Sequence, residues 1–282
     1  MFVAYRITLQ LLNFGTMDLS KIKMVVTDMD GTLLNSDHQV SAKFFSLFES
    51  LKKKDIKFVA ASGRQYHSIV DKLAAIKNDI IVIAENGGVA KQYGKELLVT
   101  PLPNATKNEV IAILDGVENV HPVLCGKDNA YITNKSTMFE QKLKEYYTNY
   151  KVLDNLNDFD GEIVKIAIYH FENSEKYIYP KVFHLENELQ VKISGANWVD
   201  ISSKNANKGY ALEKVMQENN ILPHELLVFG DYNNDLEMLA LADYSFAMKN
   251  AHPKVLKLAN YHTESNDNFG VERILEQLIN SK

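Results

Sequence analysis

The sequence has a single cysteine, Cys125, among its 282 residues. A chain with one cysteine forms no internal disulfide, so its fold does not depend on an oxidising compartment. It also lacks a long run of Lys and Arg, its net charge is −5, and no apolar stretch approaches transmembrane length. These absences argue against nucleic acid or a membrane as its main partner. We expect a cytoplasmic protein that binds a small molecule and is a monomer or a weak homo-oligomer.

The first residues, MFVAYRITLQLLNFGTM, are apolar enough to raise the question of a signal peptide. Arg6 interrupts the apolar stretch, and no small-residue cleavage site follows it. Met17 then opens MDLSKIKMVV, which has the composition of an ordinary domain start. We therefore expect residues 1–16 to be a dispensable extension, from an upstream start assignment that is not native.

The alternation of apolar runs predicts an α/β fold with two domains. The runs KMVVTDMDGTLL, IKFVAASG and DIIVIAENGG read as buried strands with helical periodicity between them, the pattern of a parallel sheet covered by helices. From about residue 89 the predicted strands become shorter and more amphipathic. The pattern of continuous apolar strands alternating with helices returns near residue 196. We expect a core domain over 17–88 and 196–282, interrupted by an α+β domain over 89–195. Gly87, Gly88 and Gly195 suit hinges at the two crossings.

Two acids follow the first buried strand directly, in the sequence DMDGT. Asp28 and Asp30 are two residues apart, so their side chains project to the same side of an extended chain. Two like charges this close need a cation or a shared proton. Mg²⁺ prefers oxygen ligands and often takes one or two carboxylates together with a substrate phosphate. A polar surface turn is the alternative interpretation, since DxDG also suits a turn.

Three further clusters lie where strands meet turns or helices. Ser62 and Gly63, in ASGR, could hold a phosphoryl oxygen at a helix N-terminus, although an ordinary serine N-cap fits equally. Lys208 begins a helix, where a cation opposes the helix dipole, and such local rule-breaking often marks function. The sequence GDYNND follows the strand ELLVF, and its first acid, Asp231, comes directly off the strand. Ligands of an open parallel sheet collect outside the carboxyl ends of its strands, where DMDGT, ASGR and GDYNND are predicted to lie.

In this order, DMDGT, SGR, the Lys of NKG and GDYNND resemble the motifs of the haloacid dehalogenase (HAD) superfamily. The long segment between SGR and Lys208, with NGG at 86–88 and NFGV at 268–271, resembles its Cof-type branch, subfamily IIB. The resemblance covers residue 21 to the C-terminus. It implies a Rossmann-like core with an inserted α+β cap of the C2B type.

The resemblance also implies a magnesium-dependent phosphatase of small phosphorylated metabolites, with sugar phosphates as the default substrates. By similarity, Asp28 is the nucleophile that forms an aspartyl-phosphate, and Asp30 is the general acid and then the general base. Mg²⁺ would be held by the Asp28 carboxylate, the Asp30 carbonyl and the Asp231 carboxylate, with Asp235 fixing the metal waters. The phosphoryl oxygens would be held by Met29, Ser62, Gly63, Lys208 and Asn234.

Two alternatives stay open at this point: a phosphomutase on the same scaffold, and a regulator that binds a phosphorylated metabolite without turnover. The inserted domain is expected to close over the site and select the leaving group. Its candidate specificity residues, with those of the adjoining turns, are Arg64, Asn86, Tyr131 and Trp198. No pair of the eight histidines has a metal-ligand spacing, and we expect His38 to be a surface residue.

Overall fold

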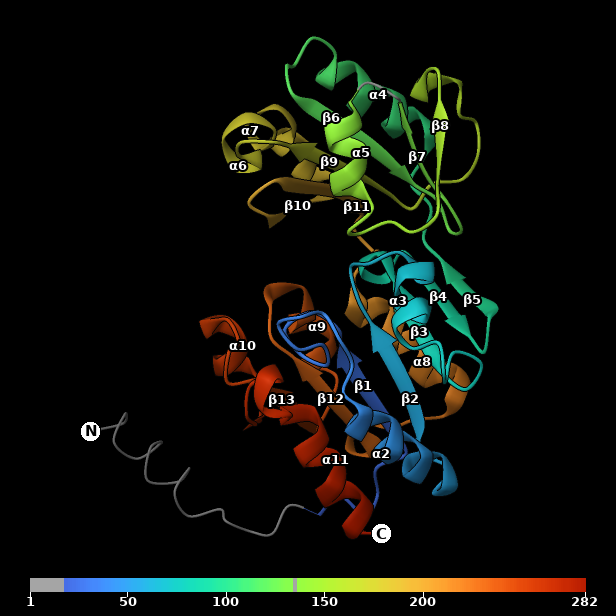
Figure 1. Cartoon of the computed structure of the whole chain (residues 1–282), viewed down its shortest axis with the longest axis vertical. Coiled ribbons are helices and arrows are strands. Elements are labelled where there is room, and N and C mark those ends of the chain that lie inside the picture. The colour runs from blue at the N-terminus through green and yellow to red at the C-terminus, as the bar shows by residue number, and fades with distance from the viewer. Residues whose placement is uncertain (1–17, 134–135) are drawn as a thin grey trace, which may run out of the picture.

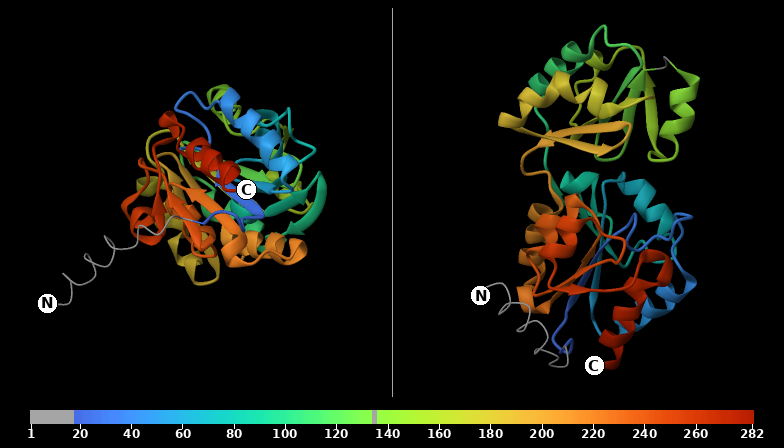
Figure 2. Two further views of the ribbon diagram at one scale, coloured as in Figure 1. Left: turned by 90° about the horizontal axis from the view of Figure 1, so that it is seen from below. Right: turned by 90° about the vertical axis from the view of Figure 1, so that its left-hand side faces the viewer.

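The structure, a computed structural model, describes residues 18–133 and 136–282. It contains two sheets in two stacked parts, which we call the core domain and the cap domain (Figures 1 and 2). The predicted extension over 1–16 lies outside the described residues. Within the described ranges, no helix is long and apolar enough to cross a membrane.

The core domain is built on an eight-stranded sheet in the order β14-β13-β12-β1-β2-β3-β4-β5. The six strands from β14 to β3 are parallel, and the hairpin of β4 and β5 adds two antiparallel strands at one edge. The strands are β1 (Met24–Asp28), β2 (Lys57–Ala61), β3 (Ile81–Ala84), β4 (Val89–Gln92), β5 (Lys95–Val99), β12 (Leu226–Gly230), β13 (Tyr244–Ala247) and β14 (Tyr261–His262). The predicted parallel sheet of an α/β core is confirmed.

Helices cover both faces of this sheet. On one face, α2 (Ala42–Lys53) and α11 (Gly270–Asn280) pack side by side, and α8 (Lys208–Asn219) lies on the opposite face (Figure 2). The other core helices are α3 (Tyr66–Lys72), α9 (Leu236–Leu239) and α10 (Pro253–Leu258). Helix α2 begins where the Ser41 hydroxyl accepts a hydrogen bond from the Phe44 N–H, which satisfies one of its free donors.

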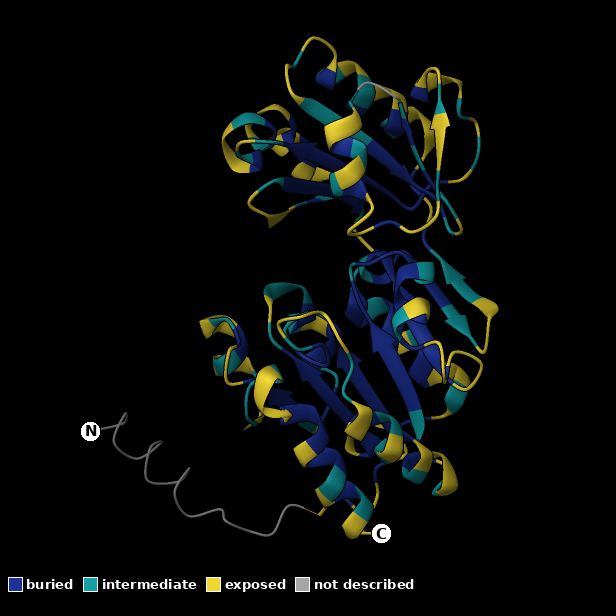
Figure 3. Ribbon diagram, in the orientation of Figure 1, coloured by how far each residue is buried: buried dark blue, intermediate teal, exposed yellow. Residues whose placement is uncertain are grey.

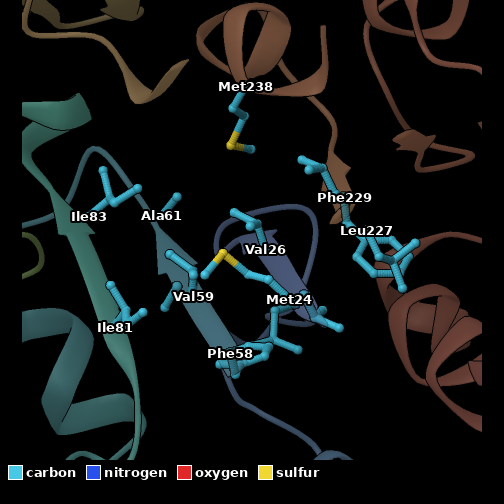
Figure 4. Packing of buried hydrophobic residues seen from close by; sticks show 14 of the residues in the cluster. Met24, Val26, Phe58, Val59, Ala61, Ile81, Ile83, Leu227, Phe229 and Met238 are labelled. Atoms are coloured by element: carbon cyan, nitrogen blue, oxygen red, sulfur yellow. The ribbon is translucent and has the colours of Figure 1, made fainter. Parts of the chain in front are cut away.

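Burial of the central strands explains why their sequences are continuous apolar runs rather than alternating ones. All five residues of β1 and of β12 are buried, as expected for parallel strands covered on both faces (Figure 3). Side chains from β1, β2, β3 and β12 gather in one cluster, which Met238 of α9 faces (Figure 4). This packed layer fixes the positions at which the strands end.

The cap domain has a six-stranded sheet in the order β10-β11-β9-β6-β7-β8, antiparallel except between β7 and β8. Its strands are β6 (Val120–Cys125), β7 (Ala130–Thr133), β8 (Tyr150–Leu153), β9 (Lys165–His170), β10 (Leu189–Gly195) and β11 (Trp198–Ser203). Its helices are α4 (Asn104–Leu114), α5 (Thr137–Leu143), α6 (Ser174–Tyr177) and α7 (Tyr179–Val182). The predicted α+β module with a separate sheet is confirmed.

Both expected domain boundaries were wrong. The first, at residue 89, lies two strands too early, and the second, at residue 195, lies one strand too early. Strands β4 and β5, over 89–99, belong to the core sheet, and β11, over 198–203, belongs to the cap sheet. The chain therefore enters the cap between Val99 and Leu102, which pairs with Ile163 in the cap, and leaves it after Ser203. Gly195 ends β10 inside the cap and is no hinge. The amphipathic pattern of these strands indicates that one face of each is buried, but it does not indicate which of the two sheets they join.

Candidate active site

The structure brings the predicted clusters together at the carboxyl ends of three adjacent strands. Asp28 ends β1 and pairs with Ala61 at the end of β2, so Ser62 follows at the same edge. Strand β12 lies on the other side of β1, and Asp231 follows its last residue. The parallel register thus places residues that are distant in sequence along one edge of the sheet.

Lys208 lies at the centre of this edge and is fully buried. Its Nζ is 2.5 Å from Asp28 Oδ1 and 2.7 Å from Asp235 Oδ1. Burial alone would lower the pKa of Lys208, but the charges of the two carboxylates outweigh it and raise the pKa. Its place in the first turn of α8 is therefore explained, because these two carboxylates compensate the cation.

Both carboxylate oxygens of Asp235 accept hydrogen bonds from the protein. Its Oδ2 accepts hydrogen bonds from the backbone N–H groups of Asp231 and Tyr232, at 2.9 and 3.0 Å, while its Oδ1 faces Lys208. Asp235 therefore shapes the turn after β12 and fixes the ammonium of Lys208.

Three carboxylates form a group that fits a divalent cation. One oxygen from each of Asp28, Asp231 and Asp235 lies within 4.8 Å of the others. Burial raises the pKa of Asp28 well above its usual value, and Lys208 opposes that shift only in part. Burial, followed by the charge of Asp235, raises the pKa of Asp231 to about 7. Burial and mutual repulsion make it unfavourable for these three acids to be ionised together. Such groups are typical of sites where a bound cation supplies the compensating positive charge.

Gly31 lets the turn after β1 approach Asp231. Its φ is +78°, and a Cβ at this position would lie 2.3 Å from Asp231 Oδ2. We expect Gly31→Ala to displace the Asp231 carboxylate and to weaken divalent-cation binding at least about tenfold, because strain and steric overlap act together. Calorimetric titration with Mg²⁺ measures this effect. Gly94→Ala is the matched control, since Gly94 also has a positive φ but faces open space. Unchanged Mg²⁺ affinity in Gly31→Ala would contradict the expectation.

Asp30 is not part of the three-carboxylate group and pairs with Arg64. The Nε and Nη2 of Arg64 donate to its two oxygens at 2.6 and 2.7 Å, in a bidentate arrangement. Burial would raise the pKa of Asp30, but the hydrogen bonds and charge of Arg64 outweigh it and hold the pKa below its usual value. His38, expected as an ordinary surface residue, is exposed, yet its Nδ1 lies 3.3 Å from Asp30 Oδ1.

The turn after β2 is held by its own backbone and by Asn86. The Ser62 hydroxyl accepts a hydrogen bond from the Arg64 N–H at 3.1 Å, and the Asn234 amide donates to Asn86 Oδ1 at 3.0 Å. A Cβ on Gly63 would come within 3.1 Å of the Asn86 side chain. Ser62, Gly63, Asn86 and Asn234 therefore form one compact wall of the site.

A cavity of about 530 Å³ opens above these groups and is lined by both domains. Its core lining includes the acids and turns described above, and its cap lining is Tyr146, Tyr147, Lys165, Ser194, Gly195, Trp198 and Asp200. Arg64, Asn86 and Trp198 line it, as expected of specificity residues. The expectation for Tyr131 was wrong, because its ring packs on Phe159 at 4.1 Å and does not line this cavity.

Several lining residues were missed by the sequence argument. Lys165 and Asp200 interrupt apolar strands, in EIVKIAIYH and WVDIS, and a charge inside a buried strand was the available signal. Gln65 follows the SGR motif and exchanges two hydrogen bonds with the backbone of Asn149 in the cap, at 2.8 and 3.1 Å. No local pattern identified Gln65, because its partner lies 84 residues away.

Comparison with known proteins extends the resemblance over nearly the whole chain. The sequence model of the haloacid dehalogenase-like hydrolases matches residues 25–275. The 5-amino-6-(5-phospho-D-ribitylamino)uracil phosphatase YbjI of Escherichia coli (strain K12) is 28% identical over 261 residues, covering 92% of this chain and 96% of that protein.

Solved structures agree. SMU.1108c from Streptococcus mutans UA159 superposes with a TM-score of 0.83 at 26% identity, covering 92% of this chain and 99% of that one. The HAD subclass IIB sugar phosphatase BT4131 shares the fold, with a TM-score of 0.75 at 20% identity, over 90% and 98% of the two chains. The motifs, the two-domain fold and these matches agree, and the chain belongs to the haloacid dehalogenase-like hydrolase family.

Proposed function

We propose that this protein is a magnesium-dependent phosphatase that hydrolyses small phosphorylated metabolites through an aspartyl-phosphate on Asp28. The observation that carries the proposal is the buried contact of Lys208 with Asp28, beside the carboxylates of Asp231 and Asp235. This arrangement supports the proposal, because it gathers the Asp28 carboxylate, a buried ammonium and further carboxylate oxygens around one point.

The metal would be held by the carboxylates of Asp28 and Asp231 and the carbonyl of Asp30. Bound there, Mg²⁺ supplies positive charge that stabilises the negative charge of the transferring phosphoryl group. Lys208 donates to the Asp28 carboxylate, which favours its ionised form and fixes its position. Ser62, Gly63, Met29 and Asn234 offer hydroxyl, amide and backbone donors to the phosphoryl oxygens.

The chemistry of the proposed reaction divides between two acids. An oxygen of Asp28 attacks phosphorus, the bond to the leaving oxygen breaks, and that oxygen takes a proton from Asp30. Asp30 then takes a proton from water, which attacks phosphorus and frees Asp28 and inorganic phosphate. Asp30 can act as the acid only when it is protonated, so Arg64 has to release it once substrate is bound.

Sugar phosphates and phosphorylated sugar alcohols are the substrate class we propose. The relative from Escherichia coli is named for a phosphorylated ribityl compound, and a structural neighbour is titled a sugar phosphatase. The cavity of about 530 Å³ is of the size of small-molecule sites and is lined by polar groups and aromatic rings.

The test is Mg²⁺-dependent release of phosphate from p-nitrophenyl phosphate, followed by a panel of sugar and sugar-alcohol phosphates. We expect turnover with Mg²⁺ and none in EDTA. Binding of these phosphates without release would favour the regulator. Transfer of the phosphoryl group to another hydroxyl of the sugar would favour the phosphomutase.

The raised pKa of Asp231 predicts that Mg²⁺ binding depends on pH. Its pKa in the folded, metal-free protein is about 7, above its ordinary value of 3.8, so protons compete with the cation below pH 7. We expect about tenfold weaker Mg²⁺ binding at pH 6 than at pH 8. Mg²⁺ should also raise the melting temperature less at pH 6. Calorimetric titration at the two pH values measures this, and equal affinities would contradict it.

A further inference from the structure

One face of the cap sheet carries the polar residues that reach the cavity. In β9, Ile166 and Ile168 pack toward the apolar cluster with α4, while Ala167 and Tyr169 face the cluster with α5. Alternation of side chains along a strand places Lys165 on the same face as Ala167 and Tyr169.

The neighbouring strand β11 follows the same rule. Val199 and Ile201 pack with the α4 side, whereas Trp198 packs with the α5 side, so Asp200 shares the face of Trp198 and Lys165. Strands β9 and β11 are paired, with Asp200 opposite Ala167, which brings the two charged residues close together.

Lys165 connects this face to the phosphate end of the cavity. Its Nζ lies 2.7 Å from Glu85 Oε2 in the core and 3.5 Å from Asp200 Oδ2. It also donates to the Gly63 carbonyl at 3.4 Å, in the turn that carries Ser62. One buried ammonium therefore spans the two domains and is surrounded by acceptors.

Asp200 keeps unused acceptor capacity. The residue is 9% exposed and lines the cavity. Within the described ranges its one ion pair is with Lys165, through Oδ2, and no hydrogen-bond donor of the protein reaches its Oδ1. A nearly buried carboxylate with an open oxygen calls for a donor from a bound molecule.

We propose that Asp200, held by Lys165, is a specificity-determining residue that accepts hydrogen bonds from hydroxyl groups of the leaving group and disfavours substrates with a second phosphate. The proposal rests on the proposed phosphatase function and adds the residue that selects the substrate.

The charge of the group explains both preferences. Glu85 and Asp200 surround a single ammonium, so the three charges sum to −1 when both acids are ionised. Hydroxyl groups satisfy such a carboxylate, and a second phosphate placed beside it meets like charge. Trp198 and Tyr146 line the cavity close by and offer apolar faces to the carbon skeleton of a sugar.

Asp200→Asn tests the proposal, because it keeps the shape and removes the charge. We expect kcat/KM for fructose 6-phosphate to fall about tenfold or more, the effect of losing a hydrogen bond to a charged acceptor. For p-nitrophenyl phosphate, whose leaving group carries no hydroxyl group in the ester, we expect at most about a twofold fall. The preference for fructose 6-phosphate over fructose 1,6-bisphosphate should narrow. Asp154→Asn, an exposed acid of the cap, is the matched control.

Equal losses on both monophosphates would show a structural role and overturn the proposal, as would wild-type kcat/KM on the bisphosphate equal to that on fructose 6-phosphate. Calorimetric binding of fructose 6-phosphate to Asp28→Asn, with and without Asp200→Asn, reports the same contact without turnover. If the wild-type protein hydrolysed neither monophosphate, the phosphatase function would fail. The binding comparison would still decide the role of Asp200: weaker binding supports it and unchanged binding overturns it.

Discussion

Asp28→Asn should lower phosphatase turnover by a factor of about 10⁴ or more, the scale of removing a nucleophile from a group of residues that act as a unit. The amide keeps the size of the side chain but is a poor nucleophile and a weaker ligand for a divalent cation. The fold should survive, because Lys208 keeps its contact with Asp235 and a carboxylate that burial disfavours is removed. Phosphate release from p-nitrophenyl phosphate and thermal unfolding measure the two expectations.

Asp71→Asn serves as the control for this prediction, since Asp71 is exposed on α3 and lies outside the cavity lining. If Asp28→Asn lost both its activity and its fold, the loss of activity would not identify the nucleophile. Mass spectrometry therefore supplies a second measurement. Wild-type protein quenched during turnover should carry a phosphoryl group on Asp28. Near-normal turnover by Asp28→Asn, or phosphorylation at another residue, would exclude Asp28 as the nucleophile.

Lys208→Met should be the most destabilising single change in the site. Lys208 is fully buried, and its loss leaves the carboxylates of Asp28 and Asp235 without their cation. Breaking a buried pair by removing one partner costs about 3–5 kcal/mol of unfolding free energy. Urea unfolding at pH 8 measures this loss. We also expect turnover to fall at least about a hundredfold, because a fixed charge beside the phosphoryl group is removed.

Two measurements distinguish an electrostatic cause of the lost unfolding free energy from a packing defect. The loss of unfolding free energy in Lys208→Met should be smaller at low pH, because burial raises the pKa of Asp28 and this carboxylate then takes up a proton. It should also be smaller with Mg²⁺, which returns positive charge to Asp28. Lys214→Met, on the same helix, is the control, because Lys214 is only partly buried and hydrogen-bonds to Gln217. If the loss of unfolding free energy depended on neither pH nor Mg²⁺, the electrostatic explanation would be contradicted.

The core motifs could be predicted because their positions follow from local patterns. An apolar run ending in acids gives a strand that stops at a polar turn, and parallel strands end at one edge of a sheet. This logic correctly placed Asp28, Ser62 and Asp231 together. Lys208, noted for its place at the start of a helix, meets Asp28 at the same edge. It did not predict that Asp30 would be bound by Arg64, since that contact depends on the path of the turn.

The cap was predicted less well, and Tyr131 shows why. An α+β cap was expected, but the pairing of its strands and the face that each strand presents were not. Tyr131, which packs on Phe159, was therefore taken for a cavity residue. The prediction that β4 and β5 belong to the cap was wrong for the same reason. An amphipathic hairpin can pair with the edge strand of either sheet.

The sequence by itself determined the family, the α/β core and the set of residues at the carboxyl ends of its strands, because each follows from short-range order along the chain. Only the tertiary structure decided where the chain enters and leaves the cap, and which cap residues reach the cavity. The reason is that Lys165, Asp200 and Gln65 meet their partners across long sequence separations, through strand pairing and docking of the two domains. Those contacts place Asp200 in the lining of the same cavity as Asp28, where we propose that the substrate is selected.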